Sequence, residues 1–256
     1  MKKYIDDFTV IRNNRVTSDF VILDLQHPDN LPEIQPGQFV QIKVEERPDV
    51  YLRRPISVHD VDQEKGILRL LVQEVGEGTR WMGQLNPGEK INLIYPLGNS
   101  FKYTANDRVL LVGGGCGIAP LLFLGKELKK AGIQPRFLIG ARTAATLVDL
   151  TEYRAIGDVY ITTEDGSEGV KGFVIHHPVM KTETPDFNII YTCGPEPMMK
   201  VIAKYANHHN LSCQVSLENS MACGIGACLC CVTATQSGNK CTCIEGPVFD
   251  SKELKW

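Results

Sequence analysis

Hydrophobic positions in the first hundred residues come in short alternating runs separated by turn residues. These runs span residues 8–16, 19–25, 39–44, 56–59, 67–73 and 90–94, with Pro36-Gly37 and Asn86-Pro87-Gly88 between two pairs of them. A period of two over such lengths is typical of half-buried strands. Because no long helical pattern interrupts the runs, we predict an antiparallel β-barrel or sandwich.

After Pro96-Leu97-Gly98-Asn99 the pattern changes to apolar strands that alternate with amphipathic helices. The predicted strands are 108–112, 136–140, 158–162 and 188–192, and the predicted helices are 121–131, 147–155 and 196–208. Such alternation builds an α/β domain with a doubly wound parallel sheet.

The end of the chain returns to short β-rich runs, at 215–217 and 232–235, with a last hairpin expected around Gly246-Pro247. We therefore predict a multi-domain chain. Its parts are a β-barrel over residues 1–101, an α/β domain over 102–211 and a small C-terminal domain over 212–256.

Composition and charge argue against some classes of function. The chain has 256 residues, 43% hydrophobic content and a net charge of −3, which gives no support for a nucleic-acid or membrane partner. No stretch approaches the roughly 20 apolar residues of a membrane span. Acidic residues follow the first lysines at once, unlike a signal peptide, so we expect a cytoplasmic protein.

Cysteines are concentrated near the C-terminus, where six of the nine fall within residues 223–243. In a cytoplasmic protein such clustering indicates metal or redox chemistry more than disulfides. Cys223, Cys228 and Cys231 have the C-x4-C-x2-C spacing of a plant-type [2Fe–2S] site. The glycines between Cys223 and Cys228 suit a loop that turns backbone N–H groups toward the sulfurs.

The remaining ligand assignment is open on spacing alone. The fourth ligand is Cys241 or Cys243, and Cys230 is a possible alternate, since on an extended stretch it points the same way as Cys228. Structural zinc is the rival interpretation, because it also takes four thiolates. Zinc sites usually consist of two close pairs, and such pairs leave Cys223 unexplained.

Two motifs in the barrel half can bind a cofactor. Arg53-Arg54-Pro55-Ile56-Ser57 places arginines on a largely apolar strand, where a guanidinium can bind phosphate. Val75-Gly76-Glu77-Gly78-Thr79 places glycines before a short helix predicted at 80–85, which suits a pyrophosphate. The structural alternatives are an edge arginine and a helix N-cap at Thr79.

A glycine-rich loop, Gly113-Gly114-Gly115-Cys116-Gly117, joins the first strand of the α/β domain to its first helix. This context predicts a dinucleotide site, although the motif differs from G-x-G-x-x-G. Cys193-Gly194-Pro195 follows the last predicted strand, so Cys193 either faces a nicotinamide or is simply buried. Arg142 alone does not decide between NADH and NADPH.

Taken together, the order of these parts resembles the ferredoxin–NADP reductase superfamily, and more closely the electron-transfer subunits of type B, NAD-dependent dihydroorotate dehydrogenase. The resemblance covers about residues 5–252. The matching strings are Arg54-Pro55-Ile56-Ser57, Gly76-x-Gly78-Thr79, Gly113-Gly114-Gly115-x-Gly117, Cys193-Gly194-Pro195, Met221-Ala-Cys-Gly-Ile-Gly-Ala-Cys228 and Cys243-Ile-Glu-Gly-Pro-Val-Phe249. Cys116, Cys230 and Cys241 depart from the family pattern.

The resemblance implies three cofactor sites. FAD would contact Arg54, Pro55, Ile56, Ser57, Leu71, Val72, Gln73, Gly78 and Thr79 on the barrel. NAD(H) would contact Gly113, Gly114, Gly115, Gly117, Cys193, Gly194 and Pro195. The [2Fe–2S] cluster would be bound by Cys223, Cys228, Cys231 and Cys243, which makes Cys241 an extra thiol.

It also implies an oxidoreductase subunit of pyrimidine biosynthesis. The partner would be a dihydroorotate dehydrogenase catalytic subunit that carries FMN, in a heterotetramer with two copies of each subunit. Flavin is needed because it exchanges a hydride with nicotinamide and single electrons with a cluster. No catalytic acid–base pair is evident. The alternatives are the reductase subunit of a related NAD(P)H–ferredoxin oxidoreductase or sulfide dehydrogenase, whose first cluster ligand looks like aspartate, and a non-enzymatic zinc-binding module.

Overall fold

A closed barrel forms the N-terminal half of the protein. The computed structural model describes residues 2–45 and 47–256. The barrel order is β1-β2-β5-β4-β3-β6, and all of its neighbouring strands are antiparallel. The strands are β1 (Tyr4–Arg15), β2 (Phe20–Gln26), β3 (Phe39–Ile42), β4 (Arg54–Asp62), β5 (Ile67–Gln73) and β6 (Lys90–Leu97). The prediction of a barrel or sandwich thus resolves to a barrel.

Alternation along each strand decides which side chains fill the barrel. On β5, Leu68, Leu70 and Val72 belong to the barrel core, whereas Leu71 faces outward into the core of the next domain. The same period of two holds on β4, where Val58 is fully buried in the barrel. The outer face of β4 and β5 is therefore available to cofactors and to the rest of the chain.

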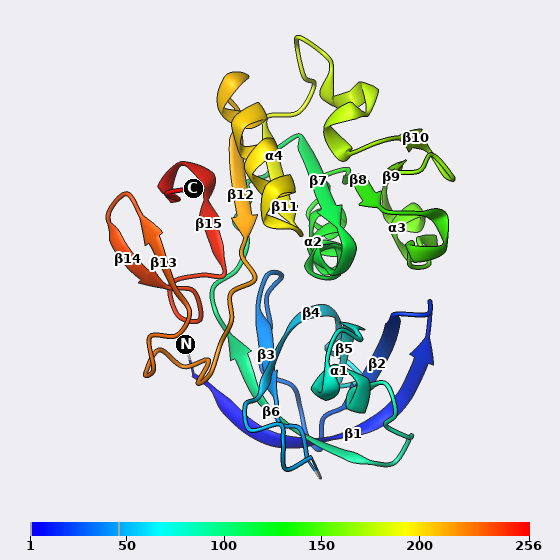
Figure 1. Ribbon diagram of the computed structural model, residues 1–256, viewed down its shortest axis with the longest axis vertical. Helices are drawn as coiled ribbons and strands as arrows, with labels where there is room; N and C mark the ends of the chain where they lie inside the picture. Colours follow the sequence, from blue (N-terminus) through cyan, green and yellow to red (C-terminus); the bar gives the residue numbers. More distant parts are fainter. Residues whose placement is uncertain (1, 46) are drawn as a thin grey trace.

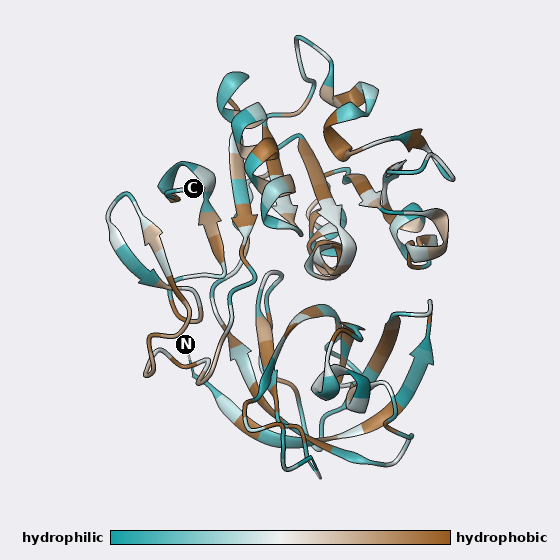
Figure 2. Cartoon of the chain, viewed as in Figure 1, coloured by the Kyte–Doolittle hydropathy of each residue, from teal (hydrophilic) through white to brown (hydrophobic). Residues whose placement is uncertain are grey.

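A seven-stranded sheet forms the second domain, in the order β10-β9-β8-β7-β11-β12-β15. Every pairing in it is parallel except β12 with β15. The strands are β7 (Val109–Gly114), β8 (Arg136–Ala141), β9 (Asp158–Thr163), β10 (Val170–Lys171), β11 (Ile189–Cys193), β12 (Ser212–Ser216) and β15 (Val248–Asp250). The central strands β7 and β11 are largely hydrophobic (Figure 2).

Helices cover both faces of this sheet, as a doubly wound fold requires (Figure 1). Side chains of α2 (Ala119–Lys130) and α3 (Thr151–Ile156) pack with Val109 and Leu111 on one face. Side chains of α4 (Glu196–His208) pack with Leu110 and Val112 on the other. The face with α2 is the one turned toward the barrel, because Phe123 of α2 enters the barrel core.

The C-terminal segment is divided between two structures. Residues 212–216 and 248–250 complete the large sheet, so the predicted 212–256 unit shares strands with the nucleotide domain. Between them, β13 (Val232–Thr235) and β14 (Gly238–Cys241) form a separate hairpin. The hairpin predicted around Gly246-Pro247 is wrong, because β15 after these residues pairs with β12, and β14 pairs with β13.

Ion pairs join the barrel to the helices of the sheet domain. Lys126 of α2 contacts Asp60 of β4 at 2.5 Å and Glu152 of α3 at 2.7 Å. Arg69 of β5 contacts the same Glu152 at 2.7 Å. His59, fully enclosed between these elements, hydrogen-bonds the Ala119 carbonyl at 2.8 Å. No helix in the described part of the chain is long and apolar enough to cross a membrane.

Candidate cofactor-binding sites

Of the two adjacent arginines on the barrel, only Arg54 has a guanidinium free to meet a ligand. Arg53 is bound inside the structure: its Nη1 donates to the carbonyls of Gln41 and Asn92, and its Nη2 to the Asn92 side chain at 2.5 Å. Arg54 donates one hydrogen bond, to the Leu52 carbonyl at 2.6 Å.

Arg54 lies directly against the start of a short helix. Helix α1 (Glu77–Met82) begins one turn earlier than predicted, at Gly76, because the Thr79 hydroxyl accepts from the N–H groups of Val75 and Gly76. Thr79 is therefore inside the helix rather than its N-cap. A Cβ on Gly78 would lie 2.9 Å from Arg54 Nε, so the glycine lets the Arg54 side chain lie close to the helix start. A guanidinium beside N-terminal N–H groups is a suitable environment for a pyrophosphate.

The other predicted FAD residues fall on both sides of the barrel wall. Ser57 pairs with Phe39 and lies on the outer face of β4, and Pro55 shares this face. Leu71 lies on the outer face of β5. Ile56 and Val72 pack on the barrel core, so only their backbone can reach a flavin on the outer face. Gln73 ends β5 and is half-buried.

The predicted dinucleotide residues form one crevice at the carboxyl ends of β7 and β11. Gly113 and Gly114 end β7, and Gly115 starts a 3-10 helix with φ +57. A Cβ on Gly117 would lie 2.3 Å from the carbonyl of Cys193, so the two loops touch backbone to backbone. Gly194, with φ +144, also lies against Gly114, since a Cβ there would be 2.8 Å from the Gly114 carbonyl oxygen. This is the place where doubly wound sheets bind nucleotides.

Glu218 is a residue of this crevice that the sequence did not reveal. The Cys116 thiol donates to both of its carboxylate oxygens at 3.6 Å, and the Cys193 thiol donates to Oε1 at 3.8 Å. Desolvation raises the pKa of Glu218 above its ordinary value. Burial raises the pKa of Cys116 to about 12 and the pKa of Cys193 well above its ordinary value, so both remain thiols at neutral pH.

Glu218 was missed because nothing local marks it. It follows β12, two residues after Ser216, and Ser216 pairs with Cys193 across the sheet. Side chains in register on adjacent strands share a face, so Glu218 reaches the glycine loop through tertiary pairing alone. Recognising β12 as a strand of the large sheet would have found it.

The C-terminal cysteines gather as two pairs of thiols. Cys223 interacts with Cys228, and Cys231 interacts with Cys243, whose backbone N–H donates to Cys231 Sγ at 3.4 Å. A [2Fe–2S] cluster has two irons, each bound by two protein thiolates, so two pairs suit it. No three His, Cys, Asp or Glu side chains among residues 2–45 and 47–256 lie close enough to hold one metal ion.

Backbone N–H groups point at these sulfurs. Cys223 Sγ accepts from the N–H groups of Ile225 at 3.5 Å and Cys228 at 3.4 Å. Gly226 donates to Cys243 Sγ at 3.2 Å. Desolvation opposes ionisation of Cys223, but these donors outweigh it and lower the pKa of that thiol to about 6. Such donors stabilise thiolate sulfur, which is the form that binds iron.

The two pairs differ in exposure. Cys231 and Cys243 are buried, 3% and 0% exposed, in a small core with Phe39 of the barrel. Cys228 is exposed, and so is the neighbouring Leu229 at 63%. The site therefore has an inner edge against the barrel and an outer edge at the surface.

The extra thiols lie beside these pairs. Leu229 has φ +58, which breaks the extended stretch assumed between Cys228 and Cys230. The two side chains therefore do not follow a strand alternation, and Cys230 Sγ donates to the Ser220 carbonyl at 3.6 Å. Cys241 ends β14, and the Glu245 carboxylate accepts its backbone N–H.

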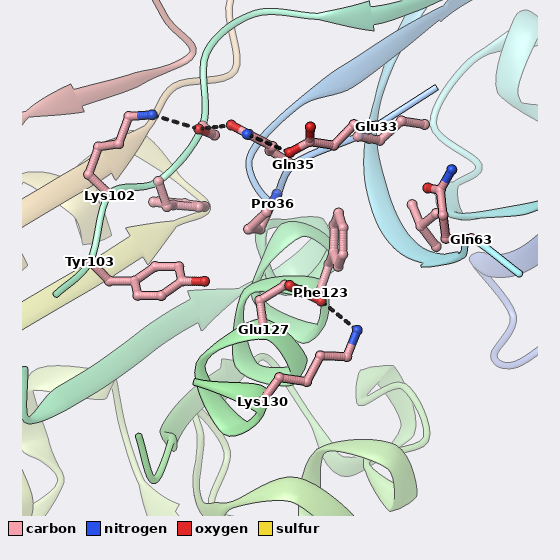
Figure 3. A pocket seen from close by; sticks show the side chains of 13 residues that line it. Glu33, Gln35, Pro36, Gln63, Lys102, Tyr103, Phe123, Glu127 and Lys130 are labelled. Atoms are coloured by element: carbon pink, nitrogen blue, oxygen red, sulfur yellow. Dashed lines mark hydrogen bonds and ion pairs between the residues drawn. The ribbon is translucent and has the colours of Figure 1, made fainter. Parts of the chain in front are cut away.

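A cavity of about 430 Å³ lies elsewhere, between the barrel and the outer end of α2 (Figure 3). None of the predicted cofactor residues lines it. Its polar side chains bind one another: Lys102 donates to Ser100, and Lys130 donates to Glu127. We assign no ligand to it.

Family models match consecutive parts of the chain. A general oxidoreductase FAD-binding domain matches residues 7–103, and an oxidoreductase NAD-binding domain matches residues 111–204. The iron–sulfur cluster binding domain of dihydroorotate dehydrogenase B matches residues 218–255. The predicted set of FAD, NAD and an iron–sulfur cluster is thereby confirmed, and the zinc interpretation is not supported.

Curated relatives match over nearly full length. The electron transfer subunit of dihydroorotate dehydrogenase B (NAD(+)) from Caldanaerobacter subterraneus is 37% identical, over 96% of both chains. That of Shouchella clausii is 34% identical over 99% of both. That of Geobacillus kaustophilus is 37% identical over 86% of both.

Solved structures share the architecture. A structure of NADH-dependent reduced ferredoxin–NADP oxidoreductase, a flavin-based electron-bifurcating enzyme, superposes with a TM-score of 0.88 at 32% identity, covering 97% of this chain and 90% of that chain. The ferredoxin reductase of carbazole 1,9a-dioxygenase superposes with a TM-score of 0.71 at 20% identity, covering 82% of this chain and 67% of that chain, and this likeness concerns the fold alone. With barrel, nucleotide sheet and cysteine pairs in this order, the chain belongs to the family of electron-transfer subunits of NAD-dependent dihydroorotate dehydrogenase B, and it combines FAD-binding, NAD-binding and iron–sulfur-binding domains.

Proposed function

We propose that this chain carries electrons between NAD(H) and an FMN-containing catalytic subunit that oxidises dihydroorotate in pyrimidine biosynthesis. The observation that carries the proposal is that the three candidate sites meet around one barrel face. Leu71 on that face packs in one core with Ile118 of the glycine loop, and Phe39 packs with Cys231 and Cys243. A flavin on this face would lie between a nucleotide and a cluster.

The barrel residues would bind FAD. Arg54 and the first N–H groups of α1, around Gly78, offer positive charge and donors to the pyrophosphate. Ser57, Pro55 and Leu71 offer an outer surface to the ring system. When bound, FAD exchanges a hydride with nicotinamide and single electrons with a cluster.

The strand-end loops of the sheet would bind the dinucleotide. Gly113, Gly114, Gly115 and Gly117 permit close backbone approach, and Cys193-Gly194-Pro195 forms the opposite wall. The Cys193 thiol and Glu218 would face the nicotinamide end of this crevice. We retain NADH as the nucleotide on the family relationship, because Arg142 is exposed and does not by itself select a ribose form.

Cys223, Cys228, Cys231 and Cys243 would bind the cluster, and Cys230 and Cys241 would not. The buried pair, Cys231 and Cys243, would form the edge toward FAD. The outer pair, Cys223 and Cys228, would form the edge toward the partner.

The catalytic subunit would dock on the outer edge. Exposed apolar side chains surround the cysteine loop there, with Ile225 45%, Leu229 63% and Ile244 41% exposed. Apolar groups gathered on one surface mark interaction sites. We propose two copies of each subunit in a cytoplasmic complex, where the nine free cysteines stay reduced.

A pull-down from the native cell with a tagged chain tests this proposal. We expect a flavoprotein that oxidises dihydroorotate, in a one-to-one ratio, and loss of that partner with Leu229→Lys. A tagged Val201→Lys variant, changed at an exposed apolar position of α4, is the control that should retain the partner. Recovery of a ferredoxin- or sulfide-dependent oxidoreductase would overturn the assignment in favour of the bifurcating enzymes that the chain also resembles.

A further inference from the structure

Gln41 is a buried side chain whose amide has no partner. It lies in β3, is 0% exposed, and neither its Nε2 nor its Oε1 has a hydrogen-bond partner in the described part of the chain. Its backbone carbonyl is used, because it accepts from Arg53. A buried amide without partners is costly, and proteins usually supply a partner, water or a ligand.

The amide faces the cysteine loop. A Cβ on Gly224 would lie 2.8 Å from Gln41 Nε2 and 2.7 Å from its Cγ, and Gly224 has φ +68. Both the close approach and the left-handed backbone require glycine here. Gly224 directly follows Cys223, so the Gln41 amide lies against the backbone next to that ligand.

Gln41 also lies next to the flavin face. It pairs with Pro55 of β4, and by alternation it shares the outer face of the barrel with Phe39 and Ser57. It thus stands between the strand proposed to contact FAD and the loop proposed to bind the cluster.

The loop already directs donors toward sulfur. Cys223 Sγ accepts from Ile225 and Cys228, both of which belong to the loop itself. The barrel side of the loop meets Gln41, a group with two N–H donors. Cluster sulfur is an acceptor, so it selects the Nε2 end of the amide over Oε1.

We propose that the Gln41 side-chain amide donates a hydrogen bond to the sulfur shell of the [2Fe–2S] cluster at Cys223 and thereby sets the cluster's reduction potential. The inference rests on the proposed function of the cysteine loop. Gln41 acts here by direct contact with the cluster from the barrel side. Because the bond strengthens as the cluster gains negative charge, it favours the reduced form and raises the potential.

The test is a redox titration of the purified holoprotein, followed by electron paramagnetic resonance for the cluster and by visible absorption for FAD. In Gln41→Leu we expect the ratio of reduced to oxidised cluster at a fixed poise to fall by up to about tenfold, which is 59 mV for one electron. The flavin midpoint should not move. Gln26→Leu is the control, because Gln26 lies on β2 and donates to the Lys65 carbonyl.

A second measurement does not depend on a variant that folds. In wild-type protein labelled with ¹⁵N at glutamine side chains, the reduced cluster should show a ¹⁵N hyperfine coupling that Gln41→Asn loses. No coupling in the wild type, an unmoved cluster midpoint at full iron content, or a shift of the flavin midpoint instead would each overturn the inference. A purified protein without iron or FAD would contradict the proposed function itself.

Discussion

At the scale of single residues, the adjacent arginines at the start of β4 have different roles, Arg54 in ligand binding and Arg53 in stability. Arg54 has one hydrogen bond and faces the start of α1, whereas Arg53 donates to Gln41 and Asn92 within the barrel. We expect Arg54→Ala to weaken FAD binding by about 10- to 100-fold, since charge-assisted hydrogen bonds contribute about 1.5–3 kcal/mol. Flavin release measured by fluorescence checks this.

Arg53→Ala is the matched variant. It removes hydrogen bonds that connect strands of the barrel, so its main effect should be a lower midpoint of thermal unfolding. If the two variants lost FAD equally while folding equally well, Arg54 would have no special role at the phosphate.

The cysteines allow a similar separation. Replacing Cys228 with serine removes an outer ligand of the proposed cluster, so electron delivery to the partner should be abolished. NADH oxidation with a dye should remain largely intact, because it requires FAD alone. Stopped-flow absorption and dye assays measure both rates.

Cys230→Ser is the control for that variant. The Cys230 thiol is exposed and donates to the Ser220 carbonyl, so its loss should leave the iron content unchanged. Loss of dye reduction in Cys228→Ser would contradict the order in which electrons are proposed to travel.

The proposed cluster ligands could be predicted from the sequence because three of them follow a known spacing motif. Cys223, Cys228 and Cys231 follow a fixed interval, and the structure brings them together with Cys243 as two pairs. Glu218 and Gln41 could not be found in that way. Each lies beside a segment that is distant in sequence: β11 for Glu218, and the cysteine loop for Gln41.

At the scale of elements, the barrel and the sheet domain were predicted well and the tail poorly. The helix at Glu196–His208 and the strand at Ile67–Gln73 have the predicted bounds, since each has strong periodicity between clear end signals. β15 has three residues and owes its strand form to pairing with β12. Such a short segment carries no period of its own, so the predicted hairpin there was wrong.

Lys126 of α2 makes a largely enclosed ionic contact with β4 and α3. It is 25% exposed and holds Asp60, which is 17% exposed, together with Glu152. Lys126→Met would leave the Asp60 carboxylate with no cation in contact, at a cost of about 1–3 kcal/mol. For a chain of this size we expect the midpoint of thermal unfolding to fall by several degrees.

Lys130→Met on the same helix provides the comparison. Lys130 is 71% exposed and pairs with Glu127 one turn away, and exposed pairs contribute about 0–1 kcal/mol. Equal midpoints for the two variants would mean that the interdomain pair does not stabilise the fold.

At the scale of the whole molecule, the barrel and the sheet share their cores. Phe20 and Leu71 of the barrel pack in the core of the sheet domain, and Phe123 of α2 packs in the barrel. A flavin site on the barrel is thereby fixed relative to the nucleotide crevice. Both domains could be predicted from their separate sequence patterns. Their relative placement could not, because it depends on side chains of each domain that pack in the core of the other.

His59 makes this junction sensitive to pH. It is enclosed between β4 and α2, its Nδ1–H donates to the Ala119 carbonyl, and burial lowers its pKa to about 4. The charges of Asp60 and Glu152 raise the pKa of His59 and that of Arg69 lowers it, but each effect is smaller than that of desolvation. His59 is therefore neutral in the folded protein at every pH above about 4.

In the unfolded chain His59 takes up a proton near pH 6.5, whereas the folded protein does not until about pH 4. Between these values the unfolded state binds more protons, so stability must fall as the pH falls. The difference amounts to about 3 kcal/mol at pH 4, and to about 2 kcal/mol at pH 5.

Urea unfolding at pH 7.0, 6.0 and 5.0 should show this loss of stability in the wild type. His59→Asn keeps an N–H donor for Ala119 but does not titrate, so its stability should change much less over the same range. Parallel curves for the two proteins would show that another group governs the pH dependence. Glu152 does not account for the loss between pH 7 and 5. Desolvation of Glu152 is outweighed by Lys126 and Arg69, which lower its pKa, and its contribution is lost only at more acidic pH.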